Sequence, residues 1–568
     1  MAEKRVRRSS SIIQDVELEV LKENLRNKHK QIVEEVDEKI DRIFEEFFHE
    51  VNKLSLNRFE VEKLFSDGQA NKSKNIKQKK QTKRITKNDQ NLPDKLPEKH
   101  FQPRNSLLTD LFEIKHVKTI YHIFIVIFNL LLLNVFVSDF VDTGKINIGL
   151  DPIITGFKGF KYAIFIWCWM QLTVFGLYPV FTTWAAMTRK YFSKRGFLTT
   201  IWHYCGVISV IAYIFGFITI YTKAVVHFNL GQASSVAVLM ELVRFVMKAY
   251  AFIRTNVPRA LKLGRKRKSS EENSSSDDSI YDSTLPASGS VKVNEKQQLP
   301  YFRQYVYFLF APTLIYRDEY PRNKLIRWNF ILVCFLEVAS VIFIMSFISE
   351  RFMYPLFHAF GSQFYEVGSK ELMGSIFNSM LPGLLCFLIG FYCVLHSWMN
   401  AFAEFLRFSD RQFYRDWWNS TNFSVYYRTW NVIVHDWLYQ YVYRDLYLHI
   451  FKKKRGICQF LVFCLSAIFH EYILGFTFRF CYPILFVEFQ GAGVLLFFAT
   501  RKDMKTIGNC FMWMSIAIGM GILLSLYHME YYARQNCSWD KDKIVNYFIP
   551  ISWSCNGLKI SENWKIQF

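Results

Sequence analysis

The sequence predicts an all-α protein with about nine transmembrane helices, and three observations support this. Of its 568 residues, 51% are hydrophobic and 18% aromatic, which is too apolar for an ordinary soluble protein with such a charged N-terminus. Apolar runs long enough to cross a bilayer recur along the chain, separated by basic segments. One run, CQFLVFCLSAIFHEYILGFTF, contains the adjacent ionisable residues His470 and Glu471. Such residues must face protein, water or substrate rather than lipid.

Residues 1–118 are predicted to form a cytosolic N-terminal region. Within it, apolar residues recur mostly three or four positions apart, which predicts an amphipathic helix that either packs on the rest of the chain or self-associates. These residues are Leu25, Ile32, Val36, Ile40, Ile43, Phe47, Val51 and Leu54. Residues 66–100 are rich in Lys, Asn and Gln without an apolar period, and we expect a disordered linker there.

Residues 119–535 are predicted to form the membrane core. The predicted spans are 119–138, 163–183, 198–221, 234–253, 328–348, 372–395, 456–475, 481–500 and 507–527. The fourth contains Glu241, Arg244 and Lys248, so it must face the bundle interior or lie partly in the interface. Residues 264–298 are rich in Ser, Asp and Glu and are predicted to form a disordered cytosolic insertion.

Basic residues give these spans one orientation. The N-terminal region is basic, and so are segments 189–195, 265–268, 452–455 and 501–505, which all follow even-numbered spans. The positive-inside rule places them in the cytosol. The C-terminal tail, residues 536–568, then lies on the opposite side, where Cys537 and Cys555 are either a disulfide or two free thiols.

Composition also excludes some functions. The net charge of +21 is concentrated in the N-terminal region and in loops beside apolar runs, which favours a membrane over nucleic acid as the partner. No nucleic-acid-binding module is recognisable. The eleven cysteines form no zinc-type CxxC array, and no HExxH motif accompanies His470. We therefore expect neither a metal site nor a nucleic-acid partner.

Imidazole accepts and returns a proton near neutral pH, so His470 suggests chemistry inside the membrane. A lone histidine on an apolar helix is, however, more often a satisfied core residue than a catalytic one. Structural hydrogen bonding is the expected role of His435. Four further histidines lie near predicted span ends and are expected at the membrane interface, namely His122, His203, His396 and His528.

Residues 398–455 form the longest predicted cytosolic stretch between late spans, and they are unusually aromatic and basic. Trp and Tyr favour the membrane interface, so an interfacial anchor is one interpretation. Polar residues are interleaved too densely for a simple anchor, namely Arg415, Asp416, Asn419, Arg428, Asn431, His435 and Asp436. Arginine and aromatic side chains together suit a ligand with phosphate at one end and an apolar chain at the other, such as a coenzyme A thioester.

These residues resemble a known family. The segment FYRDWWN is similar to the FYxDWWN signature of membrane-bound O-acyltransferases of the sterol and diacylglycerol branch. Its matching residues are Phe413, Tyr414, Asp416, Trp417, Trp418 and Asn419. The HEY context of His470 resembles that of the family's intramembrane histidine. The tracts 104–122, 243–259, 308–323 and 426–439 look like sterol O-acyltransferase, and the segment NVIVHDWLY favours the sterol branch.

The resemblance implies acyl transfer from fatty acyl-CoA to the 3-hydroxyl of a sterol, without a permanently bound cofactor. His470 would be the general base. Asn431 would orient the acyl group or stabilise the developing oxyanion. Arg428, Tyr443 and Ser466 would lie near the coenzyme A ligand. Glu471 would either fix the helix or tune the imidazole.

The resemblance also implies a location and an assembly. The catalytic chamber would lie within the membrane of the endoplasmic reticulum, open to sterol from the bilayer. The N-terminus would be cytosolic and the C-terminus lumenal, with Cys537 and Cys555 as the family's lumenal disulfide pair. A homo-oligomer, dimer or tetramer, is expected.

Two other functions remain open at this point. The first is a diacylglycerol or wax-alcohol O-acyltransferase of the same family, because FYRDWWN is shared with the diacylglycerol branch. The second is a polytopic transporter or inactive scaffold that binds lipid without turnover. Transporter folds often show internal repeats, and none is recognisable in this sequence.

Overall fold

The computed structural model describes residues 98–145, 148–191, 196–273, 299–362, 369–500, 505–540 and 543–553, with side chains at 264–273 left out. The predicted N-terminal amphipathic helix and most of the predicted insertion lie outside this part of the chain, as does Cys555. Leu96–Phe568 forms one compact unit by its internal contacts, and the following description concerns this unit.

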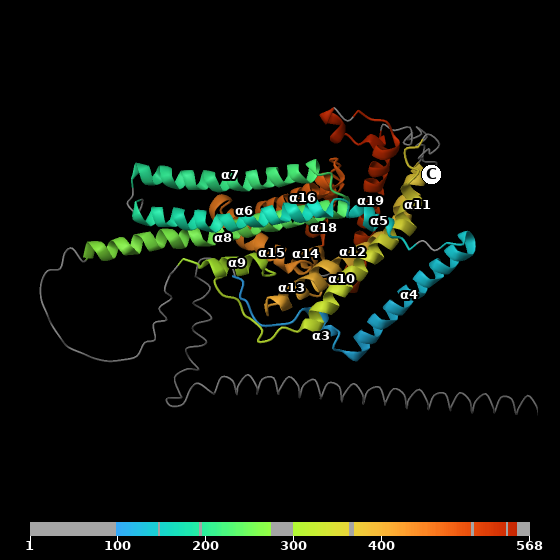
Figure 1. Ribbon diagram of the computed structural model, residues 1–568, viewed down its shortest axis with the longest axis horizontal. Helices are drawn as coiled ribbons and strands as arrows, with labels where there is room; N and C mark the ends of the chain where they lie inside the picture. Colours follow the sequence, from blue (N-terminus) through green and yellow to red (C-terminus); the bar gives the residue numbers. More distant parts are fainter. Residues whose placement is uncertain are drawn as a thin grey trace, which may run out of the picture. The chain divides into compact units, whose positions relative to one another are not determined.

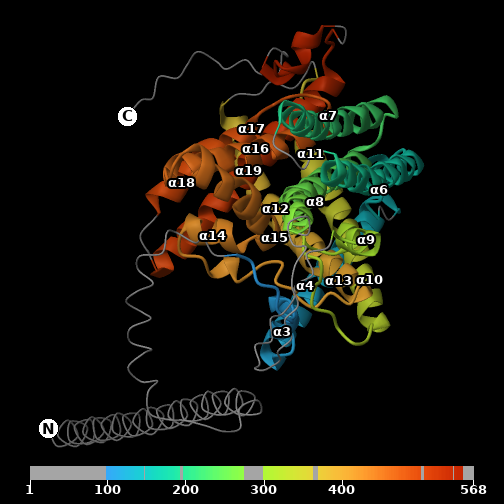
Figure 2. The same ribbon diagram turned by 90° about the vertical axis from the view of Figure 1, so that its left-hand side faces the viewer.

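The described residues fold almost entirely into helices (Figures 1 and 2). Seven helices or helix chains among them are long and apolar enough to cross a membrane. They are α4 (Lys115–Thr143), α5–α6 (Asp151–Lys190), α7 (Phe197–His227), α10–α11 (Trp328–Phe357), α12–α13 (Lys370–Phe405), α16 (Arg455–Phe478) and most of α19 (Ile507–Asn536). The only β pairings among the described residues are two isolated bridges, Arg104–Asp410 and Arg322–Phe408. The predicted all-α membrane fold is therefore confirmed.

The count of nine spans is not confirmed. The predicted eighth span corresponds to a shorter apolar helix, Ile484–Ala499. It consists of α17 (Ile484–Phe486), the π-helix η7 (Val487–Gly493) and α18 (Val494–Ala499). The predicted fourth span lies inside α8 (Gln232–Asn273), which is not among the seven candidates.

Helix α8 is long but polar on one side, and its charges pair within the protein, which agrees with the first of the two predicted placements, facing the bundle interior. Lys248 is 1% exposed, and its ammonium donates to three carbonyl oxygens at the end of α9 (Phe302–Phe310) over 2.6–3.0 Å. A cation is favoured at a helix C-terminus by the helix dipole. Arg244 pairs with Glu241 at 2.5 Å, and Glu241 also accepts from the indole of Trp167 at 3.1 Å.

The long helices pack in two groups. Helices α6 (Phe160–Lys190), α7 and α8 run side by side, and α16 packs on α8 (Figure 1). In the second group, α12 (Ser369–Phe391) packs along α19 (Lys505–Asn536). The other elements are α3 (Leu107–Leu111), α5 (Asp151–Gly156), α10 (Trp328–Ile348), η2 (Ser349–Met353), α11 (Tyr354–Phe357), η3 (Tyr392–Trp398), α13 (Met399–Phe405), η4 (Trp417–Asn419), α14 (Phe423–Thr429), α15 (Val432–Trp437), η5 (Leu438–Tyr443), η6 (Leu446–Ile450), η8 (Ile544–Tyr547) and η9 (Ile551–Trp553).

Residues 98–106, named here the N-terminal strap, cross the segment that leads into the FYRDWWN motif. Arg104 forms an isolated bridge to Asp410, and the two side chains pair at 2.6 Å. The ammonium of Lys99 pairs with Asp436 of α15 at 2.7 Å. The strap therefore holds two parts of the 398–455 stretch that are distant in sequence.

Candidate active site

His470 lies in the second half of α16, facing η7. Its ring stacks on the ring of Phe489, with centroids 5.3 Å apart and planes inclined by 24°. The side chain of His470 is exposed in this structure. His470 is therefore not packed into the core, which differs from the expectation for a satisfied core histidine.

The hydrogen bond of His470 fixes its tautomer. Nδ1 lies 2.7 Å from the carbonyl oxygen of Ser466, one turn earlier in α16. A carbonyl oxygen only accepts, so Nδ1 carries the proton and Nε2 of the neutral ring keeps its lone pair. Nε2 has no hydrogen-bond partner among the described residues. This is the tautomer that a base acting through Nε2 requires.

Glu471 and Tyr472, which follow His470, point to other elements and fix α16 in place. The carboxylate of Glu471 accepts from the hydroxyl of Tyr527 at 2.6 Å and from the backbone N–H of Phe486 at 3.1 Å. The hydroxyls of Tyr472 and Thr222 are hydrogen-bonded, which joins α16 to α7. Of the two roles open for Glu471, its contacts support the structural one.

Asn431 is the N-cap of α15. Its side-chain oxygen accepts from the backbone N–H of Val434 at 3.1 Å. Because Oδ1 is used in the cap, the amide NH₂ remains as the donor that Asn431 can offer to a ligand. No hydrogen bond or ring contact among the described residues joins Asn431 directly to His470. The two residues are connected indirectly through α14, which precedes Asn431. In this helix the ring of Tyr427 lies 5.5 Å from that of Phe489, the residue that stacks on His470.

The backbone of the FYRDWWN motif holds this cap in position. The carbonyl oxygen of Phe413 accepts from the N–H of Val432 at 2.9 Å, and the N–H of Arg415 donates to the carbonyl of Thr429 at 2.9 Å. These two bonds fix the chain on both sides of Asn431. The motif therefore acts on the candidate site through its main chain.

The aromatic side chains of the motif are core residues. Trp417 is 1% exposed, and its ring packs on Trp430 and Phe391, with centroid distances of 4.6 and 5.1 Å. Phe413 and Tyr414 are equally buried. The motif thus anchors the 398–455 stretch to the long apolar helices by burying large apolar surface.

The polar residues of the motif lie differently. Asp416 and Asn419 are exposed. Trp418 is half-buried, and its carbonyl oxygen accepts from Asn509 at 2.8 Å and from the indole of Trp513 at 3.2 Å. Both partners are in α19, so this part of the motif ties the stretch to the last long helix.

The three residues predicted near coenzyme A are not brought together by any contact among the described residues. Arg428 is exposed on α14, and its Nε donates to the carbonyl of Ser424 at 3.0 Å. Tyr443 is half-buried in η5, in a stack with Tyr439 and Tyr447 whose centroid distances are both 5.7 Å. Ser466 contributes its carbonyl oxygen to His470.

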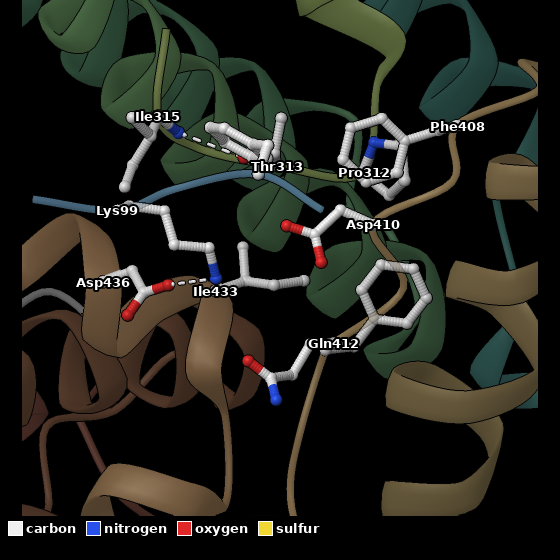
Figure 3. A pocket seen from close by; sticks show the side chains of 11 residues that line it. Lys99, Pro312, Thr313, Ile315, Phe408, Asp410, Gln412, Ile433 and Asp436 are labelled. Atoms are coloured by element: carbon white, nitrogen blue, oxygen red, sulfur yellow. Dashed lines mark hydrogen bonds and ion pairs between the residues drawn. The ribbon is translucent and has the colours of Figure 1, made fainter. Parts of the chain in front are cut away.

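The small cleft in Figure 3 lies under the N-terminal strap, between the 408–413 segment and α15. Its open space of about 20 Å³ holds about one water molecule, far less than coenzyme A requires. The Lys99–Asp436 pair closes one side. Burial alone would raise the pKa of Asp436, but its hydrogen bond with His435 and the charge of Lys99 lower it overall. The cleft is a structural junction, and His470 is not among its lining residues.

Three sequence-based predictions can be compared with the structure. His396 is buried inside the protein: it is 4% exposed, and its Nδ1 lies 2.7 Å from the hydroxyl of Tyr414. Its position at the membrane interface stays a prediction. Cys537 is disulfide-bonded, but Cys555 lies outside the described residues, so their pairing stays a prediction. In the described part of the chain, no three His, Cys, Asp or Glu side chains could hold a metal ion together.

Sequence reasoning missed Phe489 and the η7 segment that carries it. Phe489 is one apolar residue in an apolar run, and nothing in its local pattern distinguishes it. The residues beside it, Glu488 and Gln490, were the available signal, because polar side chains in such a run need a reason.

Comparison with known proteins identifies the family of this chain. The family described as MBOAT, membrane-bound O-acyltransferase, matches residues 238–529, which include α16, the motif and Asn431. Sterol O-acyltransferase 1 of Mus musculus is 38% identical over 461 residues, covering 80% of this chain and 79% of that protein. Sterol O-acyltransferase 2 of Homo sapiens is 36% identical over 462 residues, covering 81% of each. The chain therefore belongs to the membrane-bound O-acyltransferase family, in its sterol O-acyltransferase branch.

Proposed function

We propose that this protein transfers a long-chain fatty acyl group from acyl-CoA to the 3-hydroxyl of a sterol, forming steryl ester and free coenzyme A. One observation carries the proposal: Nε2 of His470 is an unprotonated, accessible nitrogen on a membrane helix, held in that tautomer by the Ser466 carbonyl. The names of the relatives support the choice of sterol as acceptor. Fatty acyl-CoA is a substrate, and no permanently bound cofactor is required.

In the proposed mechanism, His470 is the general base. Nε2 takes the proton of the sterol hydroxyl while that oxygen attacks the thioester carbonyl carbon. The C–O bond forms, the C–S bond breaks, and the coenzyme A thiolate leaves with the proton returned by the imidazolium. A thiolate is a good leaving group, so no covalent enzyme intermediate is needed.

Asn431 is proposed as the donor to the oxyanion. Its cap bond uses Oδ1, so its NH₂ can face the carbonyl oxygen on which negative charge develops. The motif residues Phe413 and Arg415 hold the chain on each side of it. Such a fixed donor costs little reorganisation during the reaction.

Coenzyme A is proposed to approach from the cytosolic face, where Arg428 is exposed. A guanidinium suits its phosphates, and the half-buried ring of Tyr443 suits its less polar parts. Ser466 lies one turn from His470, where the thioester end must reach. The basic segment Lys452–Arg455 leads into α16, and the positive-inside rule predicts it on the same face.

The proposed location is the membrane of the endoplasmic reticulum, with a cytosolic N-terminus and a lumenal C-terminus. If α8 and the α17–α18 segment also cross the bilayer, the total becomes nine spans around an intramembrane catalytic chamber. A lumenal Cys537–Cys555 disulfide and a homo-oligomer, dimer or tetramer, complete the proposal. Its topology rests on the basic segments of the sequence.

The test uses microsomes that contain the full chain, supplied with oleoyl-CoA and either cholesterol or diacylglycerol. We expect steryl ester from the wild type and a loss of about 10²–10⁴-fold in His470→Ala, the contribution typical of a positioned base. The matched control is His528→Ala. His528 has the same local geometry, with Nδ1 2.7 Å from the carbonyl of Leu524 and its ring 5.3 Å from that of Phe357.

Each result has a defined meaning. Triacylglycerol as the sole product would show that diacylglycerol, and not a sterol, is the acyl acceptor. Full activity of His470→Ala would remove the catalytic role and favour a lipid-binding protein without turnover. Equal losses in His470→Ala and His528→Ala would show that losing a helix-bonded histidine, rather than a base, lowers the activity.

A further inference from the structure

The helix that packs on His470 contains polar side chains for which the proposed mechanism has no use. Oε1 of Glu488 and both polar atoms of the Gln490 amide are buried without a hydrogen-bond partner among the described residues. They flank Phe489, whose ring stacks on His470. All three lie in η7, a π-helix, and π-helical turns are frequent at functional sites.

Glu488 faces inward from this helix. Ile484 and Phe497, before and after it, are buried at 8% and 9% exposure. The other side of the helix is open, with Val487 and Leu495 exposed at 62% and 69%. In a membrane these exposed apolar side chains meet lipid, so η7 forms a wall that borders the bilayer and packs on His470 through Phe489.

The Glu488 carboxyl lies against a glycine of a neighbouring helix. It faces Gly519 of α19, where a Cβ atom would lie 3.9 Å from Oε2. No cation or hydrogen-bond donor of the described residues reaches Oε1. Leaving a buried carboxyl without a partner costs free energy, and native proteins rarely do so unless water or a ligand supplies one.

We propose that Glu488 is a specificity-determining residue that hydrogen-bonds a second hydroxyl group of the acyl acceptor. This inference rests on the proposed function and refines its substrate class to a sterol that carries a hydroxyl besides the one esterified. A carboxyl accepts a hydrogen bond from a hydroxyl whether it is ionised or neutral. An apolar side chain at position 488 would offer no such contact.

The position of η7 favours the acceptor over coenzyme A as the ligand. Coenzyme A is water-soluble and is proposed to enter beside Arg428, which lies on α14. Glu488 lies in the wall whose outer face carries Val487 and Leu495. A lipid that reaches His470 from the bilayer must pass or rest against this wall.

The experiment compares kcat/KM in microsomes, with oleoyl-CoA fixed, for cholesterol, a side-chain-hydroxylated cholesterol and a ring-hydroxylated cholesterol. We expect the wild type to prefer at least one hydroxylated sterol. In Glu488→Leu and Glu488→Met, the ratio for that sterol over cholesterol should fall about tenfold, the effect of one such hydrogen bond. Esterification of cholesterol itself should persist in both variants.

The matched control is Gln171→Leu in α6, which removes another buried amide whose polar atoms have no partner among the described residues. Its sterol ratio should equal that of the wild type. An unchanged ratio in whichever Glu488 variant accumulates, with cholesterol still esterified, overturns the inference and leaves the proposed function intact. A change seen only with a hydroxylated acyl-CoA also overturns it. No steryl ester from the wild type overturns the proposed function and this inference with it.

Discussion

Replacing Asn431 by aspartate separates its two roles. Aspartate has the same shape and keeps an oxygen to accept from the Val434 N–H, a bond of 3.1 Å in this structure. It replaces the amide NH₂ by a second acceptor oxygen. The N-cap is therefore preserved while the proposed donor to the oxyanion is lost.

The two roles predict effects of different size. Asn and Asp are about equal as N-caps, so Asn431→Asp should leave stability nearly unchanged, whereas Asn431→Ala should cost about 0.5–2 kcal/mol. Loss of an oxyanion donor lowers kcat by about 10²–10³-fold, or roughly 2.7–4 kcal/mol. Asn431→Asp should thus be folded and nearly inactive.

The assay measures steryl ester formation in microsomes together with the thermal stability of the detergent-solubilised protein. Asn422 provides a matched control, because it caps α14 in the same way, with Oδ1 2.9 Å from the Val425 N–H. Asn422→Asp should keep both stability and activity. Wild-type activity in Asn431→Asp would refute the donor role and leave Asn431 as a cap alone.

Three further changes test the packing that supports the site. Gly493→Ala places a Cβ 2.6 Å from the Tyr427 hydroxyl. This should displace η7, lower the free energy of unfolding by about 1–3 kcal/mol and lower steryl ester formation. Gly493→Ala combined with Tyr427→Phe should recover part of both the stability and the activity. Glu404→Leu leaves the 1%-exposed Arg411, now 2.5 Å from Glu404, without its anion, and should lower stability by about 3–5 kcal/mol; an unchanged melting temperature would contradict this. Trp417→Ala empties a site that is 1% exposed and should cost about 3–5 kcal/mol by the same measurement, while wild-type stability would contradict the anchoring role of the motif.

The long apolar helices could be predicted from sequence because their signal is local composition. The predicted spans at 119–138 and 456–475 lie inside α4 and α16. Helix α8 shows where this signal fails. Arg244 and Glu241 pair with each other, and Lys248 donates to carbonyl oxygens of α9. The α9 partners are distant in sequence, so no hydropathy window detects them.

The sequence identifies the motif of the candidate site, but it does not reveal the contacts that its residues make. The FYRDWWN motif was expected near a ligand, whereas Phe413 and Trp417 are packed into the core. Their effect reaches Asn431 through backbone hydrogen bonds, which side-chain chemistry does not reveal. The burial of His396 was also unpredictable, because it depends on Tyr414 from another segment.

The N-terminal strap has a practical consequence for dividing the chain. Lys99 and Arg104 pair with Asp436 and Asp410, and Asp436 lies five residues beyond Asn431 in the sequence. The strap begins at Glu98, so a deletion that ends before it leaves both ion pairs in place. A deletion ending at Lys95 should therefore spare turnover, and one extending through Arg104 should abolish it.

Self-association and turnover can then be measured separately. If the N-terminal region governs self-association, shortening the chain to the edge of the strap yields a protein with altered assembly and intact turnover. A sensor fused at this edge would report on the chemistry of a single subunit, because its point of attachment leads directly into the strap.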